Sequence, residues 1–357
     1  MKNIQHIIRI KDIAKLSGVS EGTVDRVLHK RGEVSQKSRD AVNKALDELN
    51  YSPNIFARSL ASKKQYHFIA IIPEHSPNDY WENIEKGFDI ASQEFKNYNV
   101  HIDKIYYNQF DSFSFSEVSR QILATEFDAV FVAPVFRQET LCFTKELTAR
   151  GIPFSFFDSL IEEADYLTYY GQHSFRSGYI GAKLLLQSLD NQVQVMVFRT
   201  HRTGETVSNQ TSNRYKGFMK YIDDEKSGVF ELINVELINN DELSNRKIIS
   251  DVLSKYSNIK AAITFNSRVN RLARHFETLN HNNIRLVGYD LLEENIKYLK
   301  LGYISYLIAQ RPDKQTYFTV RDMCKKLIFD QPVNKINYVP IDILMKENID
   351  DFIQFGE

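Results

Sequence analysis

From His67 onward, short apolar segments bounded by turn residues alternate with longer amphipathic segments, and this rhythm constrains the fold more than any other feature. Short apolar runs predict buried strands, and the longer stretches between them predict helices. Strands that alternate with helices along a chain form parallel sheets covered by helices on both faces, so we expect an α/β body. The expected strands are 68–73, 101–107, 129–133, 153–157, 193–199, 261–265, 285–289 and 304–309.

The body is also long for a single sheet of this kind, which favours two lobes. We expect the first lobe to contain residues 65–172 and 291–321. The second lobe is then expected to contain residues 173–290 and 322–357. The sequence shows no internal repeat and no low-complexity segment that would indicate another architecture.

Residues 1–53 have a different pattern, that of three short helices. Gly18 can adopt the positive φ that a sharp turn requires, and it follows a first amphipathic segment. The hydroxyl groups of Ser20 and Ser35 are suited to cap a second and a third helix, and Pro53 ends the run. A helix, a glycine turn and a serine-capped helix are typical of a helix-turn-helix, although a purely structural three-helix bundle has the same pattern.

The charge is unevenly distributed along the chain. The whole protein has a net charge of −1, which by itself argues against a nucleic-acid partner. However, residues 1–64 carry 13 Lys and Arg against 7 Asp and Glu, a net charge of +6, and the remainder carries −7. A small basic module joined to an acidic body favours a module that faces a polyanion.

Five contiguous blocks in this basic module carry a specific resemblance. They are 11–20, 22–28, 34–39, 49–54 and 57–61, and together they resemble the headpiece of lactose-repressor (LacI/GalR) family regulators. The resemblance implies a sequence-specific DNA-binding transcriptional regulator, and repression is the mode we expect. It divides the chain into a headpiece over residues 1–53, a hinge helix or linker over 54–64, and an effector-binding and dimerisation domain over 65–357.

The resemblance also implies which headpiece residues contact DNA. Glu21, Gly22 and Arg26 occupy the base-facing side of the second helix, and an arginine can bond guanine through two hydrogen bonds. Ser20 and Thr23 are expected to contact phosphate. Glu21 can equally be a solvated charge at the helix start, so the base preference of relatives is not transferred to this chain.

In the family, the segment after the headpiece folds into a hinge helix in the minor groove of the operator. Leu60 aligns with the residue that wedges between two bases, and Asn54 and Ala57 precede it in the same segment. An apolar linker residue is the alternative for Leu60. Because residues 54–64 are too few for a stable helix alone in water, we expect this segment to fold conditionally.

The body resembles the type I periplasmic-binding-protein fold, in particular its ribose-binding branch. The resemblance implies a small effector bound between the lobes at the carboxyl ends of the strands, where open α/β sheets bind ligands. The expected effector residues are Asn78, Tyr80, Trp81, Asp158, Arg214, Asn266, Asp290 and Gln310. Arg176, Arg199 and Asn209 are further neighbours of the expected pocket.

These residue types suit a neutral polyhydroxylated molecule, most simply a sugar. Aromatic rings pack against C–H faces, carboxylates accept from hydroxyl groups, and arginine donates through a rigid fork. Two acids, Asp158 and Asp290, argue against an anionic ligand such as a sugar phosphate. Each residue also has a structural alternative, since the acids can cap helices, the aromatics can belong to the core, and Arg214 can form a surface ion pair.

Other function classes are disfavoured. Cys142 and Cys324 match no metal spacing, so we expect no metal or cofactor and a reduced, cytoplasmic protein. No apolar stretch is long enough for a signal peptide or a membrane span, which opposes a solute-binding protein of a sugar transport system, the main alternative. The sequence contains no phosphate-binding or nucleophile-elbow motif, so we do not expect an enzyme. We therefore expect a homodimer whose partners are operator DNA and a small effector.

Overall fold

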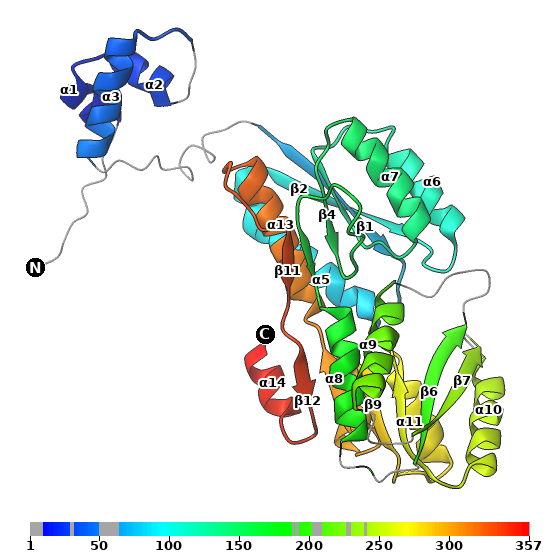
Figure 1. Ribbon diagram of the computed structural model, residues 1–357. Coiled ribbons are helices and arrows are strands. Elements are labelled where there is room, and N and C mark those ends of the chain that lie inside the picture. The colour runs from blue at the N-terminus through cyan, green and yellow to red at the C-terminus, as the bar shows by residue number, and fades with distance from the viewer. Residues whose placement is uncertain are drawn as a thin grey trace, which may run out of the picture. The chain divides into compact units, whose positions relative to one another are not determined.

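The computed structural model describes residues 10–28, 32–49, 64–187, 189, 193–201, 209–225, 230–238 and 241–356. The chain divides into two compact units, residues 1–62 and 63–357 (Figure 1). Among the described residues, no helix is long and apolar enough to span a membrane.

The first unit contains three helices, α1 (Ile10–Ser17), α2 (Glu21–Leu28) and α3 (Gln36–Glu48). Gly18 has a φ of 70° and turns the chain between α1 and α2, as the sequence predicts. The three helices enclose a small core that is formed by Ile13, Ala14, Val24, Val42 and Ala45. This packing places the apolar stripe of each helix inward and leaves the polar faces exposed.

The second unit contains two sheets of six strands each. The first sheet has the order β11-β5-β4-β3-β1-β2, and the second has the order β12-β10-β9-β8-β6-β7. All neighbouring strands are parallel except β12, which pairs with β10 in the antiparallel sense. The strands of the first sheet are β1 (Tyr66–Pro73), β2 (Val100–Tyr107), β3 (Ala129–Val132), β4 (Phe154–Phe157), β5 (Tyr169–Gly171) and β11 (Ile336–Tyr338). Those of the second sheet are β6 (Gln194–His201), β7 (Glu231–Ile238), β8 (Ile259–Thr264), β9 (Arg285–Tyr289), β10 (Tyr306–Ala309) and β12 (Asp342–Leu344).

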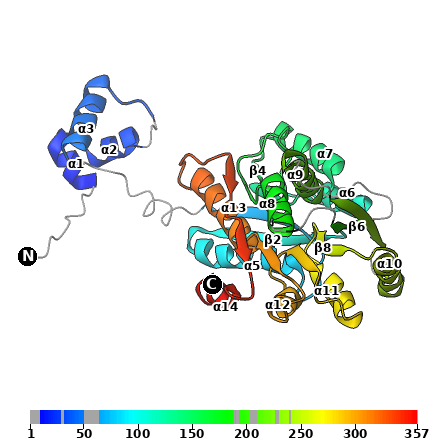
Figure 2. The same ribbon diagram turned by 60° about the horizontal axis from the view of Figure 1, so that its bottom comes forward.

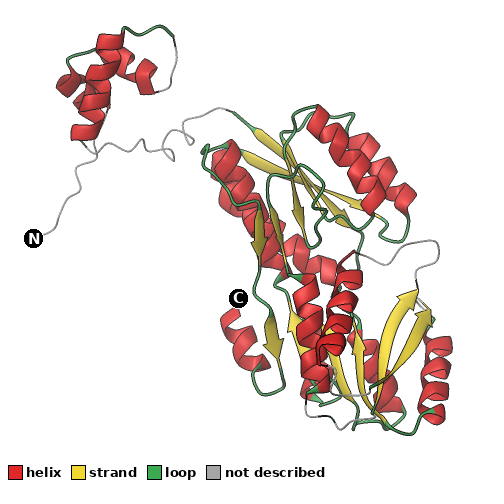
Figure 3. Cartoon of the chain, viewed as in Figure 1, coloured by secondary structure: helices red, strands yellow, loops and turns green. Residues whose placement is uncertain are grey.

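Helices cover both faces of each sheet, as Figure 3 shows. The helices of the first lobe are α5 (Tyr80–Phe95), α6 (Ser112–Ile122), α7 (Arg137–Ala149) and α13 (Pro312–Leu327), with a short 3-10 turn, η1 (Lys96–Tyr98). Those of the second lobe are α8 (Ser174–Leu186), α9 (Asn209–Glu225), α10 (Glu242–Lys255), α11 (Val269–Thr278), α12 (Glu293–Lys300) and α14 (Ile349–Gly356). Both views place α13 beside α5, although more than 200 residues separate them in the sequence (Figures 1 and 2).

Strand β1 shows why the apolar runs of this sequence are continuous. Phe68 and Ile72 point to a core shared with α5 and α13, whereas Ile69 and Ile71 point to a core shared with α6 and α7. A parallel strand covered on both faces needs apolar side chains at successive positions. All eight strands expected from the sequence are present, and their ends lie within about two residues of the expected ends. Four further strands, β5, β7, β11 and β12, were not expected.

Three segments cross between the lobes, and they correct the expected lobe boundaries. The chain leaves the first lobe after β5, returns after β10, and crosses again between β11 and β12. Residues 293–309, which were expected in the first lobe, lie with the second sheet because β10 pairs with β9. Residues 322–338, which were expected in the second lobe, belong to the first, because α13 is one continuous helix and β11 pairs with β5. Strand pairing, which the local pattern does not reveal, decides both points.

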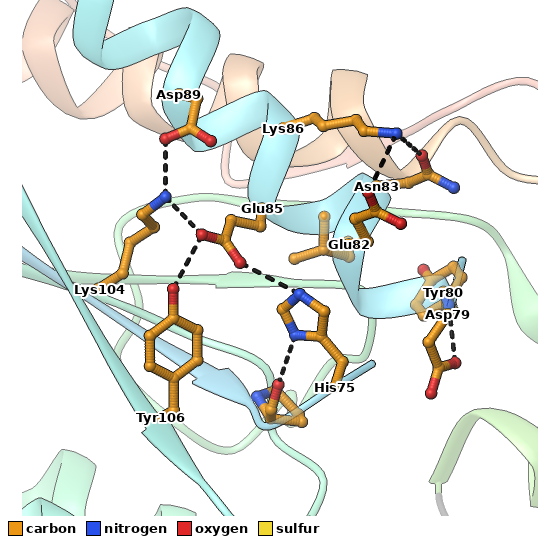
Figure 4. A network of polar contacts seen from close by, with 12 residues as sticks. His75, Asp79, Tyr80, Glu82, Asn83, Glu85, Lys86, Asp89, Lys104 and Tyr106 are labelled. Atoms are coloured by element: carbon orange, nitrogen blue, oxygen red, sulfur yellow. Dashed lines mark hydrogen bonds and ion pairs between the residues drawn. The ribbon is translucent and has the colours of Figure 1, made fainter. Parts of the chain in front are cut away.

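A polar network anchors α5 to β2 on the surface of the first lobe (Figure 4). Glu85 Oε1 accepts from the Tyr106 hydroxyl at 2.8 Å and from Lys104 Nζ at 2.5 Å, and Glu85 Oε2 lies 3.1 Å from His75 Nε2. Lys104 also pairs with Asp89 at 2.7 Å. Partial burial raises the pKa of the Glu85 carboxyl, but hydrogen bonds from Lys104 and Tyr106 outweigh it and lower that pKa overall.

Candidate functional site

The polar face of α2 is the candidate DNA-contacting surface of the first unit. Ser20 Oγ accepts from the Thr23 N–H at 3.2 Å and lies 2.9 Å from Thr23 Oγ1, so Ser20 caps this helix as expected. The side chains of Glu21 and Arg26 are exposed, and Gly22 lies on the surface between them. Since Val24 alone on this helix is fully buried, the predicted base-facing residues share a solvent-accessible face. The other predicted DNA contacts, Asn54, Ala57 and Leu60, lie outside the described residues.

A cavity between the two lobes of the second unit is the candidate effector site. It is lined from both lobes, and we call it the interlobe cavity. Six of the eight predicted effector residues line it, namely Tyr80, Trp81, Asp158, Arg214, Asn266 and Asp290. Gln310 is not in the lining but contacts Asp290 directly. Asn78 is also not in the lining, where the next residue, Asp79, stands instead.

Tyr80 and Asp158 form the central contact of the first-lobe wall. Asp79 begins α5 by accepting the Tyr80 N–H at 2.7 Å (Figure 4), and this cap places the Tyr80 side chain inside the cavity. The Tyr80 hydroxyl donates to Asp158 Oδ1 at 2.6 Å. Burial, followed by the nearby Asp158 and Asp290 carboxylates, raises the pKa of Tyr80 well above its ordinary value. Tyr80 is therefore a neutral donor in the folded protein.

Asp158 follows β4 in a left-handed backbone conformation, with a φ of 65°. Aspartate is among the few residues that adopt this region readily. Its carboxylate accepts from Ser159 Oγ at 3.0 Å and from Gln210 Nε2 at 3.1 Å, in addition to Tyr80. Burial raises the pKa of Asp158, although Tyr80 and the charge of Arg214 act in the opposite direction. Asp158 caps no helix, which rules out the structural alternative for this acid.

Asp290 holds the corresponding position after β9, with a φ of 71°. Gln310 Nε2 donates to Asp290 Oδ1 at 2.7 Å, and Gln310 Oε1 accepts from Gln210 Nε2 at 3.0 Å. Burial raises the pKa of Asp290 to about 6, with the charge of Arg214 acting against the shift. Helix α12 begins after Leu292, so Asp290 is also not a helix cap. Gln210 therefore links the two carboxylates through hydrogen bonds to Asp158 and Gln310.

Arg214 is a buried arginine in the cavity wall whose guanidinium is only partly hydrogen-bonded. Its side chain is only 1% exposed, which excludes a surface ion pair. Nη1 donates to the Phe265 carbonyl oxygen at 2.9 Å, and the guanidinium lies 3.9 Å from the ring centre of Tyr289. Nε and Nη2 are buried and have no hydrogen-bond partner among the described residues. Buried donors without partners are costly, so acceptor groups on a ligand would satisfy them.

Trp81 and Asn266 complete the predicted set. Trp81 is buried, belongs to the core beneath α5, and donates from Nε1 to Gln109 Oε1 at 3.4 Å. It is thus both a core aromatic and part of the cavity wall. Asn266 follows β8, and its Oδ1 accepts from the Arg268 N–H at 2.9 Å, which fixes the loop that leads to α11.

Sequence reasoning missed several lining residues of the second lobe. The sequence did not predict Gln210 as a lining residue, because its hydrogen-bond partners, Asp158 and Gln310, are far away in the sequence. His275 lies in the last turn of α11 and has no acidic or Cys partner at ligand spacing in the sequence, yet its Nε2 lies 3.9 Å from Glu242 at the start of α10. Of the three further neighbours that we expected, only Arg199 lines the interlobe cavity. The other lining residues that were not predicted include Arg268, Arg271, Glu236, Leu237, Ile238 and Asn245.

Two family models match this chain. Residues 9–54 match bacterial regulatory proteins of the lacI family, and residues 69–331 match a periplasmic binding protein domain. Among solved structures, a Bacteroides fragilis protein assigned as a LacI transcriptional regulator is 33% identical with a TM-score of 0.76. The match covers 81% of this chain and 99% of that protein.

The chain belongs to the LacI family of bacterial regulatory proteins.

Curated relatives and solved structures match different shares of the chain. The ribose operon repressor of Lactococcus lactis is 23% identical over 95% of this chain and 97% of its own length. The regulator MalR of Streptococcus pneumoniae is 35% identical, but the match spans only 24% of this chain and 28% of that protein. A glucose-galactose binding protein from Geobacillus stearothermophilus, 21% identical, superposes with a TM-score of 0.69 over 80% of this LacI-family chain and 99% of its own. That last similarity concerns the fold alone.

Proposed function

We propose that this LacI-family protein is a homodimeric transcriptional regulator whose DNA affinity is controlled by a sugar in the interlobe cavity. The observation that carries the effector part is Arg214, a buried arginine with two donor nitrogens that lack partners among the described residues. Asp158 and Asp290 supply carboxylate acceptors in the same cavity. Hydroxyl groups both donate and accept, so a polyhydroxylated molecule can satisfy both sides of the cavity at once.

DNA recognition is proposed to lie in the first unit. The exposed Glu21, Gly22 and Arg26 are available to base edges, and Ser20 and Thr23 at the start of α2 are available to phosphate. The net charge of +6 in residues 1–64 supports attraction to the phosphate backbone. A dimer would present two such modules to a pseudo-palindromic operator, as helix-turn-helix dimers do.

Regulation follows from the position of the cavity between two lobes. A ligand that contacts Tyr80 and Asp158 in one lobe and Arg214 in the other stabilises one relative arrangement of the lobes. If only one arrangement supports operator binding, ligand and operator affinities are coupled, and the coupling is reciprocal. The factor by which the effector changes operator affinity must equal the factor by which the operator changes effector affinity.

The experiment that tests this proposal uses an operator selected from random DNA by the full-length chain. Trp81 is the only tryptophan and lines the cavity, so its fluorescence should respond to effector. We expect a sugar that changes the fluorescence also to change operator affinity in a gel-shift titration. Asp290→Ala should abolish the response to sugar while preserving operator binding without sugar.

The alternative is a solute-binding protein for transport, which would share the two-lobed body but would not need a DNA-binding headpiece. The match of residues 9–54 to the lacI family disfavours it. A chain that binds sugar but shows no sequence preference in the DNA selection would overturn the regulator and leave this alternative.

A further inference from the structure

The interlobe cavity extends along the edge of the second sheet. Its lining includes Asp290 after β9, Asn266 after β8, Arg199 on β6 and Ile238 at the end of β7. These four strands are consecutive neighbours in the sheet. Adjacent strands lie about 4.8 Å apart, so the cavity spans roughly 14 Å along this edge. That length exceeds one pyranose ring with its hydroxyl groups.

The end of the cavity near β7 is lined by residues that have no role in the proposed binding of the first sugar ring. They come from β7, α10 and α11, and we call this end the outer subsite. Its residues are Leu237, Ile238, Glu242, Asn245, Arg271 and His275. By contrast, Asp158 and Asp290 directly follow β4 and β9, and Arg214 lies in the second turn of α9.

The backbone of the outer subsite is held in place by buried polar side chains. Asn245 is 6% exposed, and its amide both accepts the Ile238 N–H at 2.8 Å and donates to the Ile238 carbonyl at 2.7 Å. This pair of bonds attaches the end of β7 to α10. His275 on α11 is 5% exposed, and its Nε2 lies 3.9 Å from the Glu242 carboxylate, beyond hydrogen-bond distance. The two bonds of Asn245 therefore make β7 and α10 a preorganised wall, and α11 lines the same end of the cavity.

The side chains on this wall have the chemistry that binds a sugar ring. The Glu242 carboxylate can accept hydroxyl protons, and the Arg271 guanidinium can donate to hydroxyl oxygens. Leu237 and the half-exposed Ile238 offer apolar surface to the C–H groups of a ring. Because Glu242 and Arg271 carry opposite charges, this pair requires no net charge on the ligand.

We propose that the outer subsite binds a second, glycosidically linked sugar unit, so that the effector is a neutral disaccharide. One unit lies against Asp158, Arg214 and Asp290, and the other lies between Glu242 and Arg271. This inference rests on the proposed function, since it specifies the ligand of the same cavity.

The test compares monosaccharides with disaccharides by isothermal titration calorimetry on the full-length chain. The probes are glucose, galactose, mannose and xylose, together with maltose, cellobiose, lactose, mannobiose and xylobiose. We expect at least one disaccharide to bind about tenfold or more tightly than either of its component sugars, as one additional charge-assisted hydrogen bond would give.

Two variants of the outer subsite, one on α11 and one on α10, locate the effect. Arg271→Ala should weaken disaccharide binding about tenfold or more and leave monosaccharide binding unchanged. Arg274→Ala is the matched control, because Arg274 lies one turn further along the helix and pairs with Glu294 at 3.7 Å outside the cavity. Glu242→Ala is the second variant, to be used if Arg271→Ala does not fold, and the same selective loss is expected.

The outcomes separate this inference from the proposed function. Monosaccharide binding that no disaccharide improves, or an equal loss of both in Arg271→Ala and Glu242→Ala, would overturn the outer subsite and leave a sugar-controlled regulator. If no probe binds and none changes operator affinity, the proposed control by a sugar is itself wrong, and the proposal of a second sugar unit in the outer subsite is wrong as well.

Discussion

The Tyr80 hydroxyl lies 2.6 Å from Asp158 Oδ1, in the interior of the first lobe wall of the interlobe cavity. Both side chains are almost completely buried. This bond holds a carboxylate in the cavity that would otherwise be expensive to bury. Because it joins the start of α5 to the end of β4, it also sets the shape of this wall of the cavity.

Removing the Tyr80 hydroxyl tests this relationship. Tyr80→Phe is expected to lower the free energy of unfolding by about 1–3 kcal/mol, because a buried acceptor loses its shortest donor. Chemical denaturation of the ligand-free chain measures the change. Tyr106→Phe is the control, since it removes a hydroxyl bond to Glu85 on the exposed surface and should cost less than about 1 kcal/mol. Equal losses in both variants would contradict a special role for the Tyr80 contact.

Asp290 gives the stability a specific pH dependence. A carboxyl whose pKa is raised to about 6 by burial contributes stability that is complete below its unfolded pKa, about 4, and is lost as the pH rises through 6. Asp290→Asn removes this loss. The variant should therefore gain about 2–3 kcal/mol relative to the parent between pH 4 and pH 7, since a tenfold change in acid constant corresponds to about 1.4 kcal/mol.

Urea denaturation across this pH range measures the Asp290 effect. Asp350→Asn removes an exposed carboxylate that pairs with Lys300 and serves as the control. A stability difference between Asp290→Asn and the parent that is independent of pH would refute the assignment of this titration to Asp290.

Gln210 is expected to transmit ligand binding between the lobes. Its amide donates to Asp158 at 3.1 Å and to Gln310 at 3.0 Å, so it joins groups from separate elements. Gln210→Leu should reduce the factor by which effector changes operator affinity, and should do so more than it reduces operator affinity alone. Gel-shift titrations with and without effector give this factor. Gln121→Leu on the exposed surface of α6 should have no effect, and an unchanged factor in Gln210→Leu would exclude the relay.

Arg26 is expected to contribute to base recognition. Arg26→Gln should lower affinity for the selected operator by about 1–3 kcal/mol and relax the preference at one base pair. Lys44→Gln removes the same charge from α3, where Lys44 pairs with Glu48, and should change affinity much less. Fluorescence anisotropy with the operator and with single-base variants measures both. A uniform loss on all sequences would indicate a phosphate contact instead.

Leu60 is predicted from the sequence to insert between bases at the operator centre. Leu60→Ala should therefore reduce operator affinity strongly while effector binding stays intact, because an apolar wedge stabilises the kinked duplex. A gel-shift titration beside a sugar titration separates the two effects. Equal operator affinity for variant and parent would show that Leu60 is only a linker residue.

Much of the candidate site could be predicted because its residues follow strands. Asp158, Asn266 and Asp290 each come directly after an apolar run, and parallel strands bring their carboxyl ends to one edge. The two acids even share a backbone conformation, with φ values of 65° and 71°. Asn78 does not line the cavity; the next residue, Asp79, caps α5 and lines it, followed by Tyr80 and Trp81.

The sequence by itself determined the three-helix headpiece, the strand–helix order of the body and the polar residues at the strand ends. These features depend on caps, turns and apolar periodicity, which act between near neighbours. Only the tertiary structure decided where the chain crosses between lobes, that Gln210 joins Asp158 to Gln310, and that His275 faces Glu242. Such contacts join segments that are remote in the sequence, and strand order and helix packing create them rather than any local pattern of residues.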